Sequence, residues 1–170
     1  RARGFDSWTG YWHHSNDYWN HIEGPKCNGK SVADLWHYND TFDGPATWFQ
    51  NTPSCSQNNQ THTSTAPCVY EEELLADHVV SILNSHQKTD GNKPLFLYWA
   101  MHLVHMPLQV PNSYLEKYPE NLYPNVHRQH MTAMVNYMDD EVGRVLQTLE
   151  TNNMFNNTII TFHADNGGEI

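Results

Sequence analysis

The sequence lacks any long apolar run and is poor in basic residues. No stretch approaches the roughly 20 consecutive apolar residues that a membrane-spanning helix needs, so no membrane span is predicted. Among 170 residues, Lys and Arg total 9 against 19 Asp and Glu, a formal net charge of −10 with neutral His. A dedicated nucleic-acid-binding protein would present a basic face instead. The composition therefore argues against nucleic acid as the partner.

Charged residues are also scarce, at 16% of the chain, whereas aromatic residues reach 12%. Disordered chains show few aromatics and dense charge, so this composition predicts folded material. The length fits one domain by the usual range of about 100–200 residues. Protonation of all 12 His would bring the formal charge from −10 to +2. An unperturbed imidazole titrates near pH ~6.5, so this is compatible with an acidic lysosomal setting or simply with a His-rich surface.

Cysteine is rare as well, with three residues that form neither a CxxC pair nor a zinc-finger spacing: Cys27, Cys55 and Cys68. The last two bracket a polar loop and could be bridged, which would leave the first unpaired or paired elsewhere. Three N-x-T sequons offer possible N-glycan sites: Asn39, Asn59 and Asn156. Sequons and a possible loop disulfide together favour the secretory pathway.

The region before residue 69 is less regular than the rest. Residues 1–26 are aromatic without a clear period and predict loop with short extended pieces. Residues 32–49 predict two short strands around a turn at residues 43–45. Residues 50–68 are rich in Asn, Gln, Ser and Thr, which is typical of an exposed loop.

Hydrophobic periodicity then predicts two helices, each followed by a buried strand. Three acids at residues 71–73 suit the first turn of a helix, and apolar residues follow at helical spacing to about residue 89. Residues 95–100 form a short apolar run, and a longer helical pattern at about 127–150 precedes a β-branched run at 158–162. A helix between two strands makes a β-α-β crossover, which implies parallel strands. The expected class is α/β, a mostly parallel sheet flanked by helices.

Two loops leave the carboxyl ends of these predicted strands, where ligands bind in open α/β sheets. One carries His102 and His105, and the other carries Asp165 and Asn166. Carboxylate and amide oxygens suit Ca²⁺ or Mg²⁺, and an imidazole can donate to an anionic substrate or act as a general acid. Taken alone, the same residues also fit an ordinary Asp-Asn-Gly-Gly turn and a packed histidine. The acidic run at 139–141 lies within the second helix and is interpreted as a solvated face.

Several blocks of the sequence resemble the sulfatase family, arylsulfatase B-like enzymes in particular. GFDSWTGY at residues 4–11 is similar to the family's GFDxFxGY segment. PLFLY at 94–98 and VHMPLQVP at 104–111 look like its PLFLY…VHxPLQVP block. MDDEVG at 138–143 resembles MDExVG, and NNTII at 156–160 leads into DNGG at 165–168 as in NNTxxxF…DNGG. The blocks follow the family's order and cover most of the chain except roughly residues 25–70.

The resemblance implies an alkaline-phosphatase-like α/β core and hydrolysis of sulfate esters. It implies that Asp165 and Asn166 are ligands of an active-site Ca²⁺ and that His105 contacts the sulfate group. A cation and hydrogen-bond donors would stabilise charge that develops in the transition state. The implied substrate is a sulfated sugar, such as N-acetylgalactosamine 4-sulfate in dermatan or chondroitin sulfate. The implied location is lysosomal or secreted.

The chain departs from the family in its nucleophile. The family makes formylglycine from the Cys of a C-x-P-x-R motif, and none of the three Cys fits that motif. The family's paired N-terminal Asp is absent, and its Lys and His before GFD and Lys after DNGG would fall outside residues 1–170. We therefore expect residues 1–170 to be an internal part of one sulfatase catalytic domain, truncated at both ends and inactive alone. The alternatives are a non-catalytic homologue that binds sulfated glycans and a phosphatase or phosphodiesterase of the same superfamily.

Overall fold

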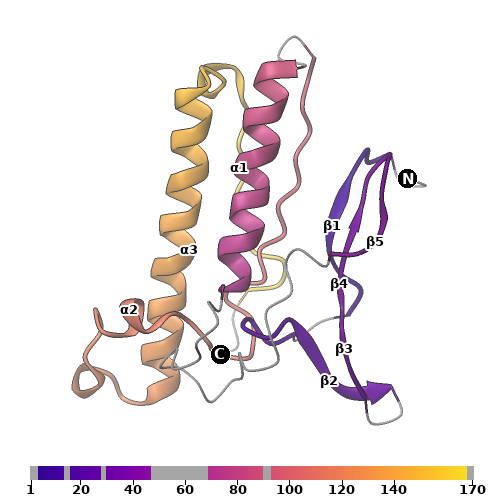
Figure 1. The fold of residues 1–170 in the computed structure, drawn as a ribbon. Helices are drawn as coiled ribbons and strands as arrows, with labels where there is room; N and C mark the ends of the chain where they lie inside the picture. The colour runs from indigo at the N-terminus through magenta and orange to yellow at the C-terminus, as the bar shows by residue number, and fades with distance from the viewer. Residues whose placement is uncertain (1–3, 14–15, 28–29, 47–68, 90–92, 168–170) are drawn as a thin grey trace.

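The protein combines two long helices with two small antiparallel sheets (Figure 1). The structure, a computed structural model, describes residues 4–13, 16–27, 30–46, 69–89 and 93–167. Its elements in chain order are β1 (Trp8–Tyr11), β2 (Ile22–Cys27), β3 (Lys30–Ala33), β4 (Leu35–Tyr38), β5 (Asp43–Pro45), α1 (Glu71–Thr89), α2 (Asn112–Leu115), η2 (Glu120–Leu122), α3 (Val126–Thr151) and η3 (Phe155–Asn157). No helix in these ranges is long and apolar enough to cross a membrane.

The helices α1 and α3 lie side by side and run in the same direction (Figure 1). Their apolar stripes meet in a cluster of buried Val79, Leu83 and Leu149, which stabilises the pair by removing apolar surface from water. Arg144 of α3 adds a polar link, because its guanidinium contacts Asp77 of α1 at 2.8 Å and Glu141 at 2.9 Å. The bounds of both helices confirm the periodicity argument to within one residue.

Both ends of α3 are capped by asparagine. Asn125 accepts a hydrogen bond from the backbone N–H of Arg128 at 2.8 Å, which satisfies one of the unpaired donors of the first turn. At the other end Asn153 has a φ of 57°, and the N–H of Met154 bonds to the carbonyl of Leu149. This is the Schellman arrangement that reverses a chain after a helix. It turns the chain back along α3.

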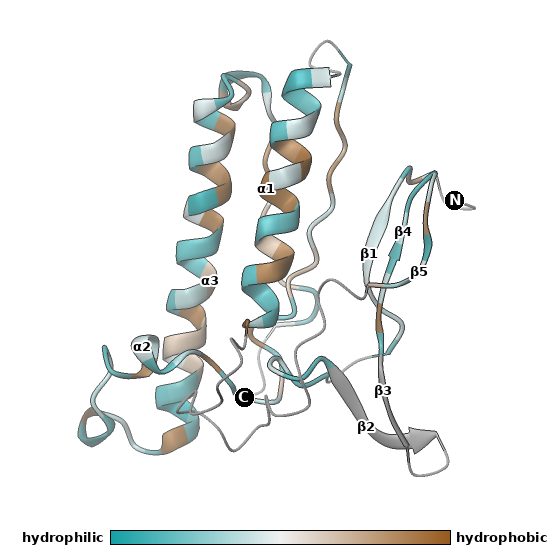
Figure 2. Cartoon of the chain, in the orientation of Figure 1, coloured by the Kyte–Doolittle hydropathy of each residue, from teal (hydrophilic) through white to brown (hydrophobic). Residues whose placement is uncertain are grey.

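The predicted strands at 95–100 and 158–162 are extended segments, but neither is hydrogen-bonded into a sheet with another described residue. Figure 1 shows that both run in one direction, opposite to the helices, as in a β-α-β unit. Leu97 and Trp99 pack on the helix pair, whereas Phe96 and Tyr98 are 77% and 66% exposed. Figure 2 shows this apolar stretch beside α1. The mixed α/β class is confirmed. No parallel strand pairing occurs within the described ranges, because neither extended segment is hydrogen-bonded to another strand there.

The N-terminal sheet has the strand order β1-β4-β5 and is antiparallel throughout. Two strands, β4 and β5, lie within residues 32–49 as predicted, but the turn predicted at 43–45 is wrong, because those residues form β5. The chain reverses at residues 39–42 instead, where the N–H of Asn39 donates to the carbonyl of Phe42. Opposite Trp36 on β4 lies Gly10 of β1. A side chain at Gly10 would come within 3.3 Å of the Trp8 ring, so the glycine makes room for that indole.

A second apolar cluster lies at the first turn of α1 and supports the loop that follows residue 100. Its buried members come from the N-terminal region, the residue just before α1, that loop and α3: Tyr18, Trp19, Tyr70, Leu103, Val110, Ala133, Met134 and Tyr137. The cluster joins segments far apart in sequence. It therefore fixes the loop that carries His102 and His105 against the helices.

Candidate functional site

The loop at residues 101–111 is anchored by two buried tyrosines. The hydroxyl of Tyr18 lies 3.0 Å from the carbonyl oxygen of His102 and 3.1 Å from that of His105, and donates to this pair. Tyr70 donates to the carbonyl of Gln109 at 2.7 Å. The Gln109 side chain accepts from the Tyr18 N–H at 3.0 Å and donates to Asp17 at 2.8 Å. The loop is thus held at both ends by groups outside it.

Two glutamates of the first turn of α1 hold the same loop from the helix side. Glu72 is 0% exposed, and its Oε1 accepts the backbone N–H groups of His102 at 2.7 Å and Leu103 at 3.0 Å. Glu71 is 1% exposed, and its Oε1 lies 3.1 Å from Nδ1 of His102. The His102 ring also stacks on Tyr18, with ring centroids 4.2 Å apart and planes 15° apart. This histidine is therefore fixed in position by a carboxyl group and an aromatic ring.

Burial changes the proton affinity of the groups beneath the loop. It raises the pKa of Glu72 from 4.5 to about 8, and the neighbouring Glu71 adds to the rise. The two N–H groups that Glu72 accepts act in the opposite direction. Burial also raises the pKa of Tyr18 and Tyr70 above the ordinary value, with Glu71 and Glu72 contributing. At neutral pH these side chains are therefore uncharged, which suits their closed surroundings.

His105 is exposed on this buried scaffold. Its backbone N–H donates to the carbonyl of His102 at 2.9 Å, and its ring lies 5.7 Å from the His102 ring. The ring Nδ1 lies 2.9 Å from the carbonyl oxygen of Met106. A carbonyl only accepts, so Nδ1 carries the hydrogen and Nε2 is the nitrogen left for a ligand. His105 thus combines a fixed backbone with an accessible ring nitrogen.

Asp165, Asn166 and Gly167 gather oxygen atoms in one exposed turn. Asp165 Oδ1 accepts the backbone N–H of Asn166 at 2.9 Å, and Gly167 has a φ of 77°. The side-chain amide of Asn166 lies beside Asp165 Oδ1 and the carbonyl of Gly167, and its nitrogen donates to both oxygens at 3.1 Å. A carboxylate and an amide oxygen are ligand types that suit a hard cation.

The two predicted halves of the site are not joined by a direct bond. In the described part of the chain no hydrogen bond or ion pair links His105 to Asp165 or Asn166. Figure 1 shows the extended segments that precede both loops running toward the end of the helix pair where α1 begins. The idea that both loops contribute to one shared site therefore stays a prediction.

The described residues alone do not complete a metal site. No group of three or more His, Cys, Asp or Glu side chains lies within metal-binding reach among them. The turn at 165–167 offers three oxygens, whereas Ca²⁺ takes about 6–8. The donor type fits calcium, and the number falls short.

Other predicted features have mixed outcomes. In the acidic run of α3, Asp139 and Asp140 are exposed as expected, but Glu141 is buried at 8% exposure, so a fully solvated face is wrong there. Arg144 neutralises Glu141, which makes its burial possible.

Cys55, Cys68, Asn59 and the expected loop at 50–68 lie outside the described residues. Cys27 closes β2.

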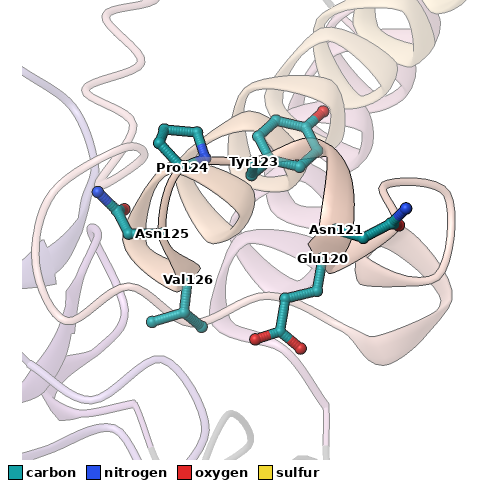
Figure 3. Close-up of a pocket in the computed structure, with 6 residues that line it drawn as sticks. All are labelled: Glu120, Asn121, Tyr123, Pro124, Asn125 and Val126. Carbon is teal, nitrogen blue, oxygen red and sulfur yellow. The ribbon is translucent and has the colours of Figure 1, made fainter.

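A surface pocket precedes α3, away from these motifs. Its lining residues are Glu120, Asn121, Tyr123, Pro124, Asn125 and Val126. Figure 3 shows Glu120 and Val126 on one side of the turn, with Tyr123 and Pro124 on the other. Glu120 is its one carboxylate, and the pocket contains none of the predicted site residues. It therefore adds no catalytic group.

Sequence reasoning missed Glu71, Glu72 and Tyr18 as parts of the candidate site. A signal for Glu72 existed, because positions 72, 76, 79 and 83 follow one helical stripe. The three positions after the first are Ala76, Val79 and Leu83, all buried. Tyr18 carried no comparable signal, since its partners lie more than 80 positions away along the chain.

The framework places the protein among α/β proteins of the alkaline-phosphatase-like class. A solved structure described as Ps i-CgsB in complex with k-i-k-neocarrahexaose aligns with a TM-score of 0.62. The alignment covers 91% of this chain and 31% of the other, at 22% sequence identity, and it supports a shared fold. The sulfatase family model matches residues 1–170. The chain belongs to the sulfatase family.

Relatives with curated descriptions agree with that membership. Mouse (Mus musculus) arylsulfatase J is 32% identical over 169 residues, which is 98% of this chain and 24% of the relative. A sulfatase of Formosa agariphila is 34% identical over 107 residues, 56% of this chain and 19% of the relative. Human (Homo sapiens) N-acetylgalactosamine-6-sulfatase is 25% identical over 100 residues, 59% and 18% respectively. The chain thus spans no more than a quarter of the length of these relatives, which are not specifically arylsulfatase B.

Proposed function

We propose that the protein containing this chain hydrolyses sulfate esters. The match of the sulfatase family model to residues 1–170 carries the proposal. The loop geometry supports it, because an accessible imidazole stands on a backbone that buried side chains hold in place. Such a group can bind an anionic ester without reorganising, which is how preorganised sites stabilise developing charge.

His105 is the residue proposed to contact the sulfate group. Its Nδ1 is engaged by the Met106 carbonyl, so Nε2 is directed to the ligand. In the protonated ring Nε2–H donates to a sulfate oxygen, and the positive charge offsets negative charge on the ester. His105 therefore binds and orients the ester. None of the Cys residues of this chain lies in a C-x-P-x-R motif, so the chain's own residues are assigned no nucleophilic role.

Asp165 and Asn166 are the residues proposed to hold a Ca²⁺ ion. The exposed turn at 165–167 supports this assignment, because it carries a carboxylate and an amide oxygen, which are ligand types that calcium takes. A bound calcium ion would supply positive charge near the ester oxygens. Asp165 provides the charge that attracts the cation, while Asn166 adds a neutral ligand without further repulsion.

The proposed substrate is a sulfated sugar, with N-acetylgalactosamine 4-sulfate of dermatan or chondroitin sulfate as the first choice. The relatives named for sugar sulfates include N-acetylgalactosamine-6-sulfatase, which favours the same sugar with a different sulfate position. We further propose a lysosomal or secreted location, with N-glycans at Asn39, Asn59 and Asn156. Asn156 is exposed, which such a modification requires.

The test is hydrolysis of a chromogenic aryl sulfate by the complete protein, with and without a chelator. We expect His105→Ala to lower kcat/KM by about 100-fold, since loss of one preorganised donor costs a reaction about that much. His127→Ala, at an exposed position on the first turn of α3, is the matched control and should leave the rate unchanged. Unchanged kinetics in His105→Ala would remove this residue from the site. Binding of the sulfated sugar without turnover would instead favour the non-catalytic homologue.

A further inference from the structure

The loop that carries the two histidines depends on carboxyl groups from another element. Among the described backbone donors of the loop, the N–H groups of His102 and Leu103 both donate to one oxygen, Oε1 of Glu72. The ring Nδ1 of His102 is hydrogen-bonded to Oε1 of Glu71. The bonded residues are 30 or 31 positions apart in sequence. The loop therefore takes its shape from the first turn of α1.

An acid at this position is costly and needs a reason. Glu72 is 0% exposed and Glu71 is 1% exposed, and two adjacent buried carboxylates would repel each other. An apolar residue would fill the space but leave two N–H groups without an acceptor, each at a cost of a lost buried hydrogen bond. The side chain at 72 therefore serves as an acceptor for the loop.

We propose that Glu72 and Glu71 are positioning residues of the sulfate-ester site, and the proposal rests on the proposed function. Glu72 fixes the backbone at His102 and Leu103, and Glu71 fixes the His102 ring. Because the N–H of His105 donates to the carbonyl of His102, the direction of the His105 imidazole follows from these contacts. Tyr18 completes the arrangement by donating to the carbonyls of both histidines.

The charge state of Glu72 decides how firmly the loop backbone is held. Its pKa of about 8 keeps the Glu72 carboxyl neutral in acid and at neutral pH. Above that pH Glu72 ionises in a buried position beside Glu71, which disfavours its charged form. The titratable groups that interact with Glu72 are Glu71 of α1, Tyr70 before it, Tyr11 of β1, Tyr18, His102 of the loop and Glu141 of α3. The loop should therefore hold its geometry better in acid than in alkali.

Three variants of the complete protein test the proposal. Glu72→Gln keeps an oxygen acceptor without an ionisable group, and Glu72→Ala removes the acceptor. Glu73→Ala changes the exposed neighbour in the same acidic run and is the matched control. The measurements are kcat and KM for an aryl sulfate from pH 5 to 9 and amide hydrogen exchange at His102 and Leu103.

We expect the unaltered protein to lose activity above pH ~8, and we expect Glu72→Gln to keep kcat/KM within about threefold at pH 5–6 without that alkaline decline. Glu72→Ala should lower kcat/KM by about tenfold or more and speed exchange of both amides by about tenfold, as loss of a buried hydrogen bond predicts. Glu73→Ala should match the unaltered protein.

Three results would overturn the positioning role. These are unchanged kcat/KM and amide exchange in Glu72→Ala, a Glu72→Gln variant as impaired at pH 5–6 as Glu72→Ala, and a pH profile that is identical in Glu72→Gln and the unaltered protein. Absence of sulfatase activity in the unaltered protein contradicts the proposed function instead. Amide exchange at His102 and Leu103 then decides the positioning role by itself.

Discussion

Tyr18 connects more parts of the candidate site than any motif residue does. Its ring lies between Tyr70, at a centroid distance of 5.3 Å, and His102, at 4.2 Å, and both pairs are stacked. Its backbone carbonyl accepts the N–H of Glu71 at 2.9 Å, which satisfies a donor at the start of α1. One residue therefore joins the N-terminal region, the helix and the histidine loop.

Removal of the Tyr18 hydroxyl should loosen the loop without emptying the core. Tyr18→Phe keeps the stacked ring but leaves the carbonyls of His102 and His105 without this donor. We expect the free energy of unfolding to fall by about 1–2 kcal/mol, measured by urea denaturation. Tyr98→Phe, at a side chain 66% exposed, is the control and should change stability little. Equal effects of the two substitutions would contradict the role assigned to the Tyr18 hydroxyl.

The candidate residues divide by how local their signals are. His105, Asp165 and Asn166 stand in short motifs, so the sequence could name them, and their joint action stays a prediction. Glu72 could have been found from the helical stripe that it shares with Val79 and Leu83, but three consecutive acids fitted a solvated first turn equally well. Tyr18 could not be predicted, because its role arises from contacts made only when distant segments meet.

The helices were predictable because their signals are local. Periodicity sets the extent of α1 and α3, and asparagine caps close both ends of α3; these signals need no knowledge of the rest of the fold. A strand differs, because its hydrogen bonds lie on a neighbour. The segments at 95–100 and 158–162 have strand-like sequences and extended backbones, yet no described segment pairs with them.

The start of α3 offers a test at this scale. Asn125→Ala removes the acceptor for the Arg128 N–H, and we expect the free energy of unfolding to fall by about 1 kcal/mol, measured by thermal or urea denaturation. Asn121→Ala, at an exposed position of η2, is a matched control without a capping role. A loss in Asn121→Ala equal to that in Asn125→Ala would argue against the cap as the source of the effect.

At the scale of the whole molecule, buried ionisable groups change the stability of the fold in opposite directions as the pH changes. Burial lowers the pKa of His37 and of His78, two rings that meet at the hydroxyl of Thr9. Folding therefore disfavours their charged forms, and their contribution to stability falls as pH drops below the ordinary value near ~6.5. Glu72 acts in the other direction, because its raised pKa makes ionisation unfavourable in the folded state.

We expect the melting temperature to pass through a maximum in mildly acidic solution. Between the ordinary pKa of 4.5 and about 8, Glu72 binds its proton more tightly in the folded state, so its contribution falls as pH rises. The slope is at most about 1.4 kcal/mol per pH unit. Thermal denaturation from pH 4 to 9 measures the curve, and Glu72→Gln should flatten its alkaline side. A melting temperature that climbs steadily from pH 6 to 9 would contradict this expectation.

The contact between Glu72 and the N–H groups of His102 and Leu103 also constrains the order in which the protein assembles. A loop whose donors are satisfied by a helix cannot reach its native shape until that helix has docked. Ligand affinity at His105 would then appear late in folding, together with the packing of α1 rather than with formation of the helix itself. A substitution far along α1 that delays docking would be detected first as lost binding, while helical content stayed near normal.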